Sequence, residues 1–150
     1  MKPLVPPPII AATLIGAMYV LAARLDVFAF DFPGRTTLAA ALFVAGFFID
    51  AVSVAAFLRA RTTVNPLAPS RSAKLVTEGL YRFSRNPMYA GMLLMLIAAF
   101  LYFGEGLNAA IVALFVVILN EAQIKPEENA LEEKFGDDYR AYKTRVRRWI

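Results

Sequence analysis

Hydrophobic positions along the chain form long uninterrupted blocks and do not alternate with the period of a water-exposed helix or strand. The blocks cover residues 8–23, 38–58, 88–103 and 107–124. A helix of about 20 residues crosses the roughly 30 Å hydrocarbon core of a bilayer, so the second block spans it comfortably and the others are slightly short. We therefore expect an all-α integral membrane protein with four transmembrane helices. The last two are joined by a tight hairpin at residues 104–106, whose sequence is GEG.

Composition supports this class and narrows the available chemistry. Of the 150 residues, 59% are hydrophobic and 19% are charged, which is typical of a chain embedded in lipid. The sequence contains neither cysteine nor histidine. Disulfides, a thiolate nucleophile, a histidine base and the commonest transition-metal ligands are therefore excluded, and we expect no metal.

The distribution of charge predicts the orientation. Basic residues gather between the second and third blocks, where Glu78 is the one acid, and again in the tail. Cytoplasmic loops carry such an excess, so both termini and the central loop are expected on the cytoplasmic face of a bacterial inner membrane. This face would attract anionic membrane lipids, whereas nucleic acid is not expected as a partner. Cleavage of residues 8–23 as a secretory signal is a weaker alternative.

We expect one domain over residues 1–150, with an N-terminal helix pair at 1–61 and a second part at 62–150. The central loop is irregular at first, and a short helix can begin at Thr77 and Glu78 and continue through Phe83. Asn86 and Pro87 can start the third membrane helix, because proline is well tolerated at the first helical position.

Two short helices are expected in the tail. Pro126 would start the first after a break, Gly136 would end it, and Asp137 would cap the second. Their apolar faces could lie on the lipid headgroups, with Trp149 as an interfacial anchor. These faces consist of Leu131 and Phe135 in the first helix, and of Tyr139, Tyr142, Val146 and Trp149 in the second.

Two segments together carry a family resemblance. The stretch LVTEGLYRFSRNPMYAG, followed by the apolar hairpin and by PEENALEEKFGDDYRAYKTRVRRWI, resembles the isoprenylcysteine carboxyl methyltransferases and their bacterial relatives, which merge into the phospholipid methyltransferases. The resemblance covers roughly residues 62–150. It implies a membrane enzyme that binds S-adenosyl-L-methionine on the cytoplasmic side and methylates a lipidic or small hydrophobic acceptor from the bilayer. Carboxyl methylation of an isoprenylcysteine is the more specific alternative.

The resemblance also implies a cofactor site. Glu127 is the acid that it assigns to this site, and Glu128 is the alternative if the register of the match shifts by one residue. Aromatic rings suit the sulfonium through cation–π attraction, and an acid suits the ammonium or ribose. Donors from Asn86, Arg85 or the start of the third helix suit the carboxylate. The implied contacts are Lys74, Leu75, Val76, Tyr81, Asn86, Pro87, Met88, Tyr89, Glu127 and Glu128.

Two departures from the family concern the reaction. The eukaryotic enzymes have histidine where Asn86 stands, and they have an arginine, associated with the acceptor carboxylate, where Gln123 aligns. A neutral amide is a poor substitute for a bidentate cation, so a carboxylate acceptor is disfavoured. Candidate catalytic residues are Gln123, Arg85 and Asp50. Asp50 lies inside the second block, where an acid is costly unless it faces a partner or a cavity. A structural hydrogen bond to Ser53 or to another helix is the equal alternative.

The same residues are also compatible with ordinary structural roles. Tyr81, Phe83 and Tyr89 could be aromatic residues of the membrane boundary, and Glu127 and Glu128 could be solvated acids of a first helical turn. A small four-helix transporter or a noncatalytic scaffold would share the hydrophobic blocks. The first block, however, lacks the acid expected of such a transporter.

Overall fold

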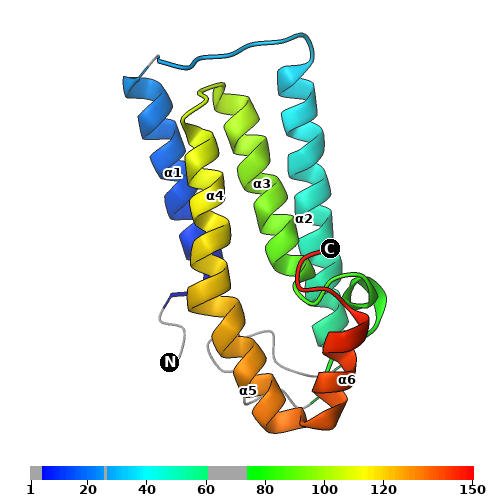
Figure 1. Ribbon diagram of the computed structural model, residues 1–150. Helices are drawn as coiled ribbons and strands as arrows, with labels where there is room; N and C mark the ends of the chain where they lie inside the picture. The colour runs from blue at the N-terminus through cyan, green and yellow to red at the C-terminus, as the bar shows by residue number, and fades with distance from the viewer. Residues whose placement is uncertain (1–4, 26, 61–73) are drawn as a thin grey trace.

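The computed structural model describes residues 5–25, 27–60 and 74–150. Four apolar helices run antiparallel to their sequence neighbours in an elongated bundle (Figure 1). They are α1 (Pro7–Arg24), α2 (Arg35–Arg59), α3 (Pro87–Phe103) and α4 (Asn108–Ile118). A 3-10 turn, η2 (Gly79–Arg82), precedes α3, and the tail forms a π-helix, η3 (Leu119–Ile124), followed by α5 (Lys125–Phe135) and α6 (Asp137–Arg145).

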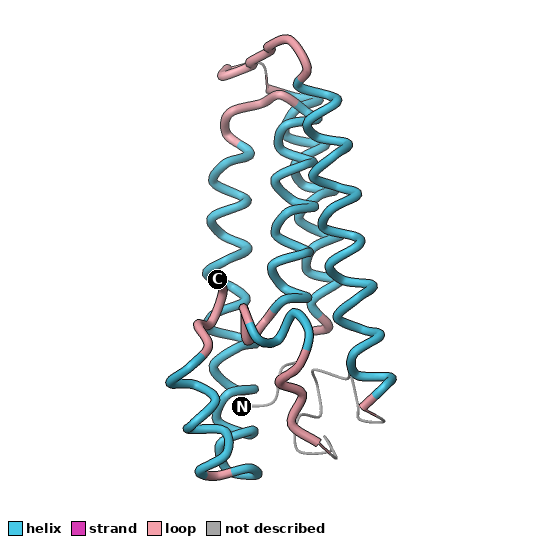
Figure 2. The backbone as a smooth tube through the Cα atoms, turned by 90° about the vertical axis from the view of Figure 1, so that its right-hand side faces the viewer, coloured by secondary structure: helices cyan, strands magenta, loops and turns pink. Residues whose placement is uncertain are grey.

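The bundle has two distinct ends. We call the end with the turn at residues 104–106 the hairpin end, and the end with η2, α5 and α6 the tail end; the two views show these elements at opposite ends (Figures 1 and 2). At the hairpin end, Gly104 terminates α3 with a φ of +67°, a left-handed conformation that glycine adopts without strain. The tight hairpin expected at this position is confirmed.

Hydrophobicity and exposure identify an integral membrane protein. Three helices are long and apolar enough to span a bilayer: Pro7–Arg24, Arg35–Arg59 and Asn108–Phe135. α3 is also strongly apolar but has 17 residues. Large side chains such as Val44, Phe47 and Phe48 are 63–66% exposed on α2, which is unfavourable in water and favourable against lipid. The expected helices are confirmed, whereas a count of four membrane crossings stays a prediction.

α2 and α3 make the most extensive helix contact of the bundle. Gly46 of α2 and Gly91 of α3 face each other so closely that a Cβ atom on Gly46 would lie 2.6 Å from the Gly91 carbonyl oxygen. Small residues allow helix backbones to approach in this way, which membrane helices use to gain packing contacts. This contact fixes the position of α3, whose first turn contributes to the candidate site.

The tail differs from expectation at the end of α4. The sequence predicts a break between Ile124 and Pro126, but residues 108–135 form one continuous helical rod with a π-helical stretch in the middle. A proline inside a helix removes one backbone hydrogen bond and clashes with a carbonyl one turn earlier. The wider π turn immediately before Pro126 accommodates both effects, and the rod continues into α5 without ending.

Three smaller expectations are also corrected. The helix expected from Thr77 to Phe83 is a single 3-10 turn, and Gly136 ends α5 but also occupies the cap position of α6, which leaves Asp137 as its first residue. The apolar faces of α5 and α6 pack on each other and on Leu75, and so do not lie open to headgroups. The irregular central loop and the expected boundary at 61/62 lie outside the described residues.

Candidate functional site

A hydrogen-bonded cluster joins the first turn of α3 to the helical rod of the tail. The Tyr89 hydroxyl donates to Glu127 Oε1 at 2.7 Å, and Gln123 Nε2 donates to the same oxygen at 2.6 Å. Tyr89 is 5% exposed and Gln123 is 1% exposed. Gln123 and Glu127 lie one turn apart on the rod, so both reach Tyr89 from the same face. The sequence motifs indicate Tyr89 and Glu127, and the structure brings them together with Gln123.

A second cluster surrounds the adjacent acid. Glu128 is 7% exposed and pairs with two arginines: Arg85 Nη2 lies 3.1 Å from its Oε1, and Arg148 Nη2 lies 2.7 Å from its Oε2. The hydrogen bond to Glu128 raises the pKa of the Arg148 guanidinium. The two neighbouring acids therefore have different surroundings. Glu128 is balanced by cations, while the hydrogen-bond partners that the structure gives Glu127 are neutral.

The end of the chain closes over the mouth of α3. The carbonyl oxygen of Arg148 accepts a 2.9 Å hydrogen bond from Asn86 Nδ2, and that of Arg147 accepts one of 2.9 Å from the Arg85 backbone N–H. Trp149 Nε1 donates to Asn120 Oδ1 at 3.2 Å. The sequence suggests Asn86 as a cofactor ligand and Trp149 as a headgroup anchor. In the structure both side chains fasten the tail to the bundle, and the cofactor contact of Asn86 stays a prediction.

Tyr81 stands between the tail and α2. Its ring meets Phe57 edge-on with centroids 5.4 Å apart, and its carbonyl oxygen accepts a 2.7 Å hydrogen bond from the Tyr142 hydroxyl. Burial raises the pKa of Tyr81 well above its usual value, and the negative charges of Glu127 and Asp50 add to this shift. Burial likewise raises the pKa of Tyr142 to about 12. Tyr81 is therefore a neutral hydroxyl near two carboxyl groups from different helices.

Asp50 lies against α3 at Gly91. A Cβ atom on Gly91 would collide with Asp50 Oδ1, so only glycine allows the carboxyl group this close to α3. Within the described part of the chain, Asp50 Oδ1 is buried without a hydrogen-bond partner. The alternative of a hydrogen bond from Ser53 is not what forms, because Ser53 Oγ donates to the Ile49 carbonyl at 2.7 Å. The Asp50 carboxylate therefore lies in the contact between α2 and α3, which we call the α2–α3 seam, and its Oδ1 can still accept a hydrogen bond.

The remaining predicted contacts lie around these clusters. Pro87 and Met88 belong to the first turn of α3, and Met88 packs against the apolar core of the bundle. Leu75 packs on the tail at Tyr139, Tyr142 and Val146; Val76 is half-buried, and Lys74 is exposed. The sequence motifs do not single out Arg148 or Gly91. An ion pair between distant segments leaves no local pattern, and the signal for Gly91 is only its place at the end of the NPMYAG run.

The charged and hydrogen-bonding groups of the two clusters suit a ligand that carries both a carboxylate and positive charge. Among the described residues, Arg85 Nε and Nη1 are buried and have no hydrogen-bond partner, so the guanidinium has two N–H directions left for a carboxylate. Glu127 offers a carboxylate whose partners are neutral, which favours a cation or a hydroxyl donor. S-adenosyl-L-methionine carries an ammonium, a sulfonium, a carboxylate and ribose hydroxyls. The residues present therefore fit this cofactor.

Comparison with known families decides the assignment of the chain. The family model for phospholipid methyltransferases matches residues 34–138, which include α2, α3, α4 and most residues of both clusters of the candidate site. The chain belongs to the phospholipid methyltransferase family. Membership of this family, together with the apolar helices, supports a membrane methyltransferase and confirms the superfamily that the sequence motifs indicate.

Two relatives of this family member match part of the chain. An uncharacterized protein of Haemophilus influenzae is 48% identical over 63 residues, which are 42% of this chain and the whole of that protein. Protein-S-isoprenylcysteine O-methyltransferase B of Arabidopsis thaliana is 34% identical over 73 residues, which are 49% of this chain and 37% of the plant protein. The match thus spans little more than a third of the plant enzyme. No solved structure matches the chain.

Proposed function

We propose that this protein transfers a methyl group from S-adenosyl-L-methionine to a lipidic or small hydrophobic acceptor at the membrane face formed by the tail end. The observation that carries the proposal is the junction of Tyr89, Gln123 and Glu127 inside the region matched by the family model. A noncatalytic scaffold has no need for a carboxylate with neutral partners and an arginine whose N–H groups can take a ligand. A small four-helix transporter is expected to carry its essential acid in the first membrane helix, and α1 contains no acid. Family membership favours the enzyme as well.

The cofactor, when bound, supplies an electrophilic methyl group on a positively charged sulfur. Glu127 is assigned to the ammonium or ribose hydroxyls, and Tyr89 and Gln123 orient its carboxylate by donating to Oε1. Arg85 is assigned to the carboxylate through Nε and Nη1, while Glu128 holds the guanidinium in place. The face of Tyr81 or Tyr89 suits the sulfonium, since a desolvated cation–π contact contributes about 2 kcal/mol.

Catalysis in this arrangement comes from positioning and from exclusion of water. The clusters are covered by the chain end, where Arg147 and Arg148 bind the mouth of α3. A dry and preorganised site strengthens electrostatic contacts and holds reacting groups in line. On the α2 side, the neutral Tyr81 hydroxyl is available to orient an acceptor through a hydrogen bond. The Asp50 carboxylate of α2 is available to take up the proton that an amine acceptor loses.

The acceptor is proposed to be an amine or another neutral nucleophile more readily than a carboxylate. Gln123 stands where carboxyl-methylating relatives carry arginine, and its amide already donates to Glu127. Isoprenylcysteine carboxyl methylation stays the second candidate, because a plant enzyme of that name shares 34% identity over the matched part. Arg85 or Lys125 would then have to supply the missing cation.

The tail end is proposed to face the cytoplasm, in a bacterial inner membrane. The basic residues Arg82, Arg85 and Lys74 lie at this end, while the hairpin end holds Glu105 and the pair Arg35–Asp31. This asymmetry follows the usual excess of positive charge on cytoplasmic segments.

The direct test uses purified protein in detergent or liposomes with methyl-labelled cofactor. Phosphatidylethanolamine and farnesylcysteine serve as acceptors, and label in the organic phase is counted. We expect transfer to at least one acceptor in wild type and loss of transfer in Glu127→Ala. Calorimetry with S-adenosyl-L-methionine measures binding independently of the acceptor. Failure of the folded protein to bind the cofactor would overturn the proposal.

A further inference from the structure

Two arginines share one acid at the tail end of the bundle. Arg148 contacts both carboxylate oxygens of Glu128, with its Nε 3.0 Å from Oε1 and its Nη2 2.7 Å from Oε2. Arg85 makes one contact with the same carboxylate, from Nη2 to Oε1 at 3.1 Å. A bidentate pair between an arginine and a carboxylate is stronger than a single contact, so Arg148 is the main counterion of Glu128.

This cluster of Arg85, Glu128 and Arg148 has an excess of positive charge. Two guanidinium groups face one carboxylate, and the side chains of Arg85 and Glu128 are only 11% and 10% exposed. The hydrogen-bond partners that the structure gives the adjacent acid, Glu127, are neutral. Burial raises the pKa of Tyr139, a phenol beside Arg85, so this neighbour is neutral as well. A charge shielded from water is costly without a counterion, so the cluster favours a bound anion.

Arg85 is the group through which the anion can bind. Its Nε and Nη1 are buried and have no hydrogen-bond partner among the described residues. Arg148 uses its Nε and Nη2 for Glu128. Because Arg148 already satisfies both oxygens of this acid, Arg85 can keep its remaining N–H groups for a ligand. Without Arg148, Glu128 would draw the Arg85 guanidinium toward itself, since a largely buried carboxylate needs a close partner.

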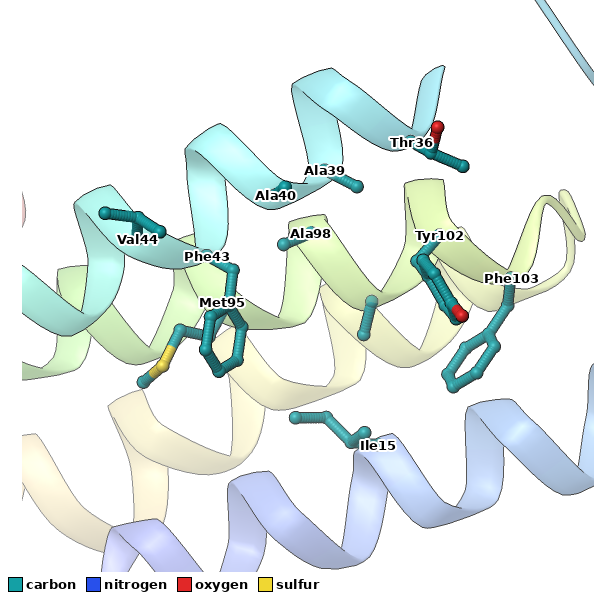
Figure 3. Close-up of a pocket in the computed structure, with 11 residues that line it drawn as sticks. Ile15, Thr36, Ala39, Ala40, Phe43, Val44, Met95, Ala98, Tyr102 and Phe103 are labelled. Carbon is teal, nitrogen blue, oxygen red and sulfur yellow. The ribbon is translucent and has the colours of Figure 1, made fainter. Parts of the chain in front are cut away.

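The apolar cavity of the bundle does not compete for this anion. It lies between α1, α2 and α3 toward the hairpin end and is lined by side chains such as Ile15, Phe43 and Met95 (Figure 3). Thr36 and Tyr102 are the polar residue types among the described residues that line it, and none of these residues is charged. An unpaired carboxylate is strongly disfavoured in such surroundings. The anion is therefore expected at Arg85.

Arg148 belongs to the non-helical segment 146–150, which follows α6 and lies beside the first turn of α3 (Figure 1). The carbonyl oxygen of Arg148 accepts a 2.9 Å hydrogen bond from Nδ2 of Asn86, the neighbour of Arg85 in the sequence. The backbone and the side chain of Arg148 thus bind on the two sides of Arg85. If the segment lifts from α3, Glu128 loses its main counterion, so closure of the segment and the availability of Arg85 change together.

We propose that Arg148 is a positioning residue for the cofactor: by pairing with Glu128 it leaves Arg85 available to the carboxylate of S-adenosyl-L-methionine, so that closure of segment 146–150 and binding of this carboxylate reinforce each other. This inference rests on the proposed function. Coupling of this kind is reciprocal. A ligand that carries the carboxylate therefore holds the chain end closed by the same factor by which the closed chain end tightens the ligand.

The decarboxylated form of S-adenosyl-L-methionine tests the proposal, because it keeps the sulfonium, the ammonium and the ribose and lacks the carboxylate. Calorimetry in detergent measures the affinity of both ligands for wild type, Arg148→Ala and Arg147→Ala. Arg147→Ala is the matched control, because the Arg147 side chain is exposed and the substitution keeps the backbone carbonyl that binds Arg85.

We expect wild type and Arg147→Ala to bind the intact cofactor about tenfold or more tightly than the decarboxylated form, as a charge-assisted contact predicts. In Arg148→Ala this ratio should fall to about threefold or less, because Arg85 turns to Glu128. A purely structural role of Arg148 would weaken both ligands alike and leave the ratio unchanged.

Limited proteolysis of wild type gives a second readout that needs no variant. With each ligand at saturation, the intact cofactor should slow cleavage of the tail more than the decarboxylated form does. Equal affinities of the two ligands for wild type, an unchanged ratio in Arg148→Ala, or equal protection of the tail would overturn the inference while cofactor binding stands. If folded wild type binds neither ligand, the proposed function fails and the inference fails with it.

Discussion

Tyr89 and Glu127, 38 residues apart, meet in a 2.7 Å hydrogen bond between the phenol and a carboxylate oxygen. The bond joins the helix that begins at Asn86–Pro87 to the rod that follows the hairpin. It brings together two motifs that are separated in sequence by an entire helical hairpin. Since Tyr89 is buried, its hydroxyl depends on Glu127 as an acceptor, while Glu127 also accepts a hydrogen bond from Gln123.

Replacing Glu127 should weaken cofactor binding. Glu127→Ala removes the carboxylate assigned to the cationic part of S-adenosyl-L-methionine, and we expect affinity to fall about tenfold or more, equivalent to about 1.4 kcal/mol. Glu133→Ala is the control, because Glu133 is an exposed acid of the same helix. Calorimetry in detergent measures both variants. Equal affinities in the two variants would place the cofactor elsewhere.

Tyr89→Phe should reveal whether the phenol acts through Glu127. The variant keeps the ring and removes the donor, so affinity should fall less than in Glu127→Ala. In the double variant with Glu127→Ala, the phenylalanine should add almost nothing, because interacting residues are not additive. A fully additive double variant would mean that Tyr89 contacts the ligand independently.

Arg148→Ala should release the end of the chain. Glu128 would keep Arg85 but lose the partner at 2.7 Å, which for a largely buried acid costs about 1–3 kcal/mol. Arg147→Ala is the matched control, because its side chain is exposed and its contribution to the closure is a backbone carbonyl. Limited proteolysis should cut the tail of Arg148→Ala faster than that of Arg147→Ala. Identical cleavage rates would show that the ion pair does not hold the tail.

Gly91→Ala should disturb the α2–α3 seam. The new methyl group would collide with Asp50 Oδ1 and would lie 2.7 Å from the Gly46 carbonyl oxygen, and overpacking of this kind costs about 1–3 kcal/mol. Gly16→Ala introduces the same methyl group on α1, where nothing among the described residues lies within 4 Å, so it should be neutral or slightly stabilising. Thermal unfolding in detergent compares the two. A Gly91→Ala protein as stable as Gly16→Ala would contradict the close approach of Asp50.

Gln123→Arg should distinguish the acceptor classes. If the natural acceptor is an amine or another neutral group, a new cation should repel or misplace it, and methyl transfer to phosphatidylethanolamine should fall. If the acceptor is a carboxylate, transfer to farnesylcysteine should rise instead. Labelled-methyl assays with both acceptors, in wild type and variant, measure the change. Strong wild-type activity on farnesylcysteine alone would contradict our preference for a neutral acceptor.

A reporter protein fused after Ile150 should be active on the cytoplasmic side of the membrane, because the basic residues of the tail end predict that this end faces the cytoplasm. A reporter that is active only outside the cytoplasm would contradict this orientation.

The sequence predicts the helices well because long apolar blocks and Asn86–Pro87 are local signals. It also indicates Tyr89 and Glu127, which lie in motifs. It does not predict the π-helical stretch before Pro126, because a proline there is equally compatible with a break. Nor does it predict that Asn86 fastens the tail, or that Arg148 pairs with Glu128. Those contacts depend on the path of the chain in space, which no short pattern records.

The 17 residues of α3 have a consequence for where the chemistry takes place. At 1.5 Å per residue the helix is about 25 Å long, shorter than the roughly 30 Å hydrocarbon core that we expect it to cross. A bilayer adapts to such a mismatch by thinning around the short element. Because Tyr89 belongs to the first turn of α3, we expect thinning on this side to bring lipid headgroups toward the candidate site. The thickness of the host membrane would then be part of how the site reaches its acceptor.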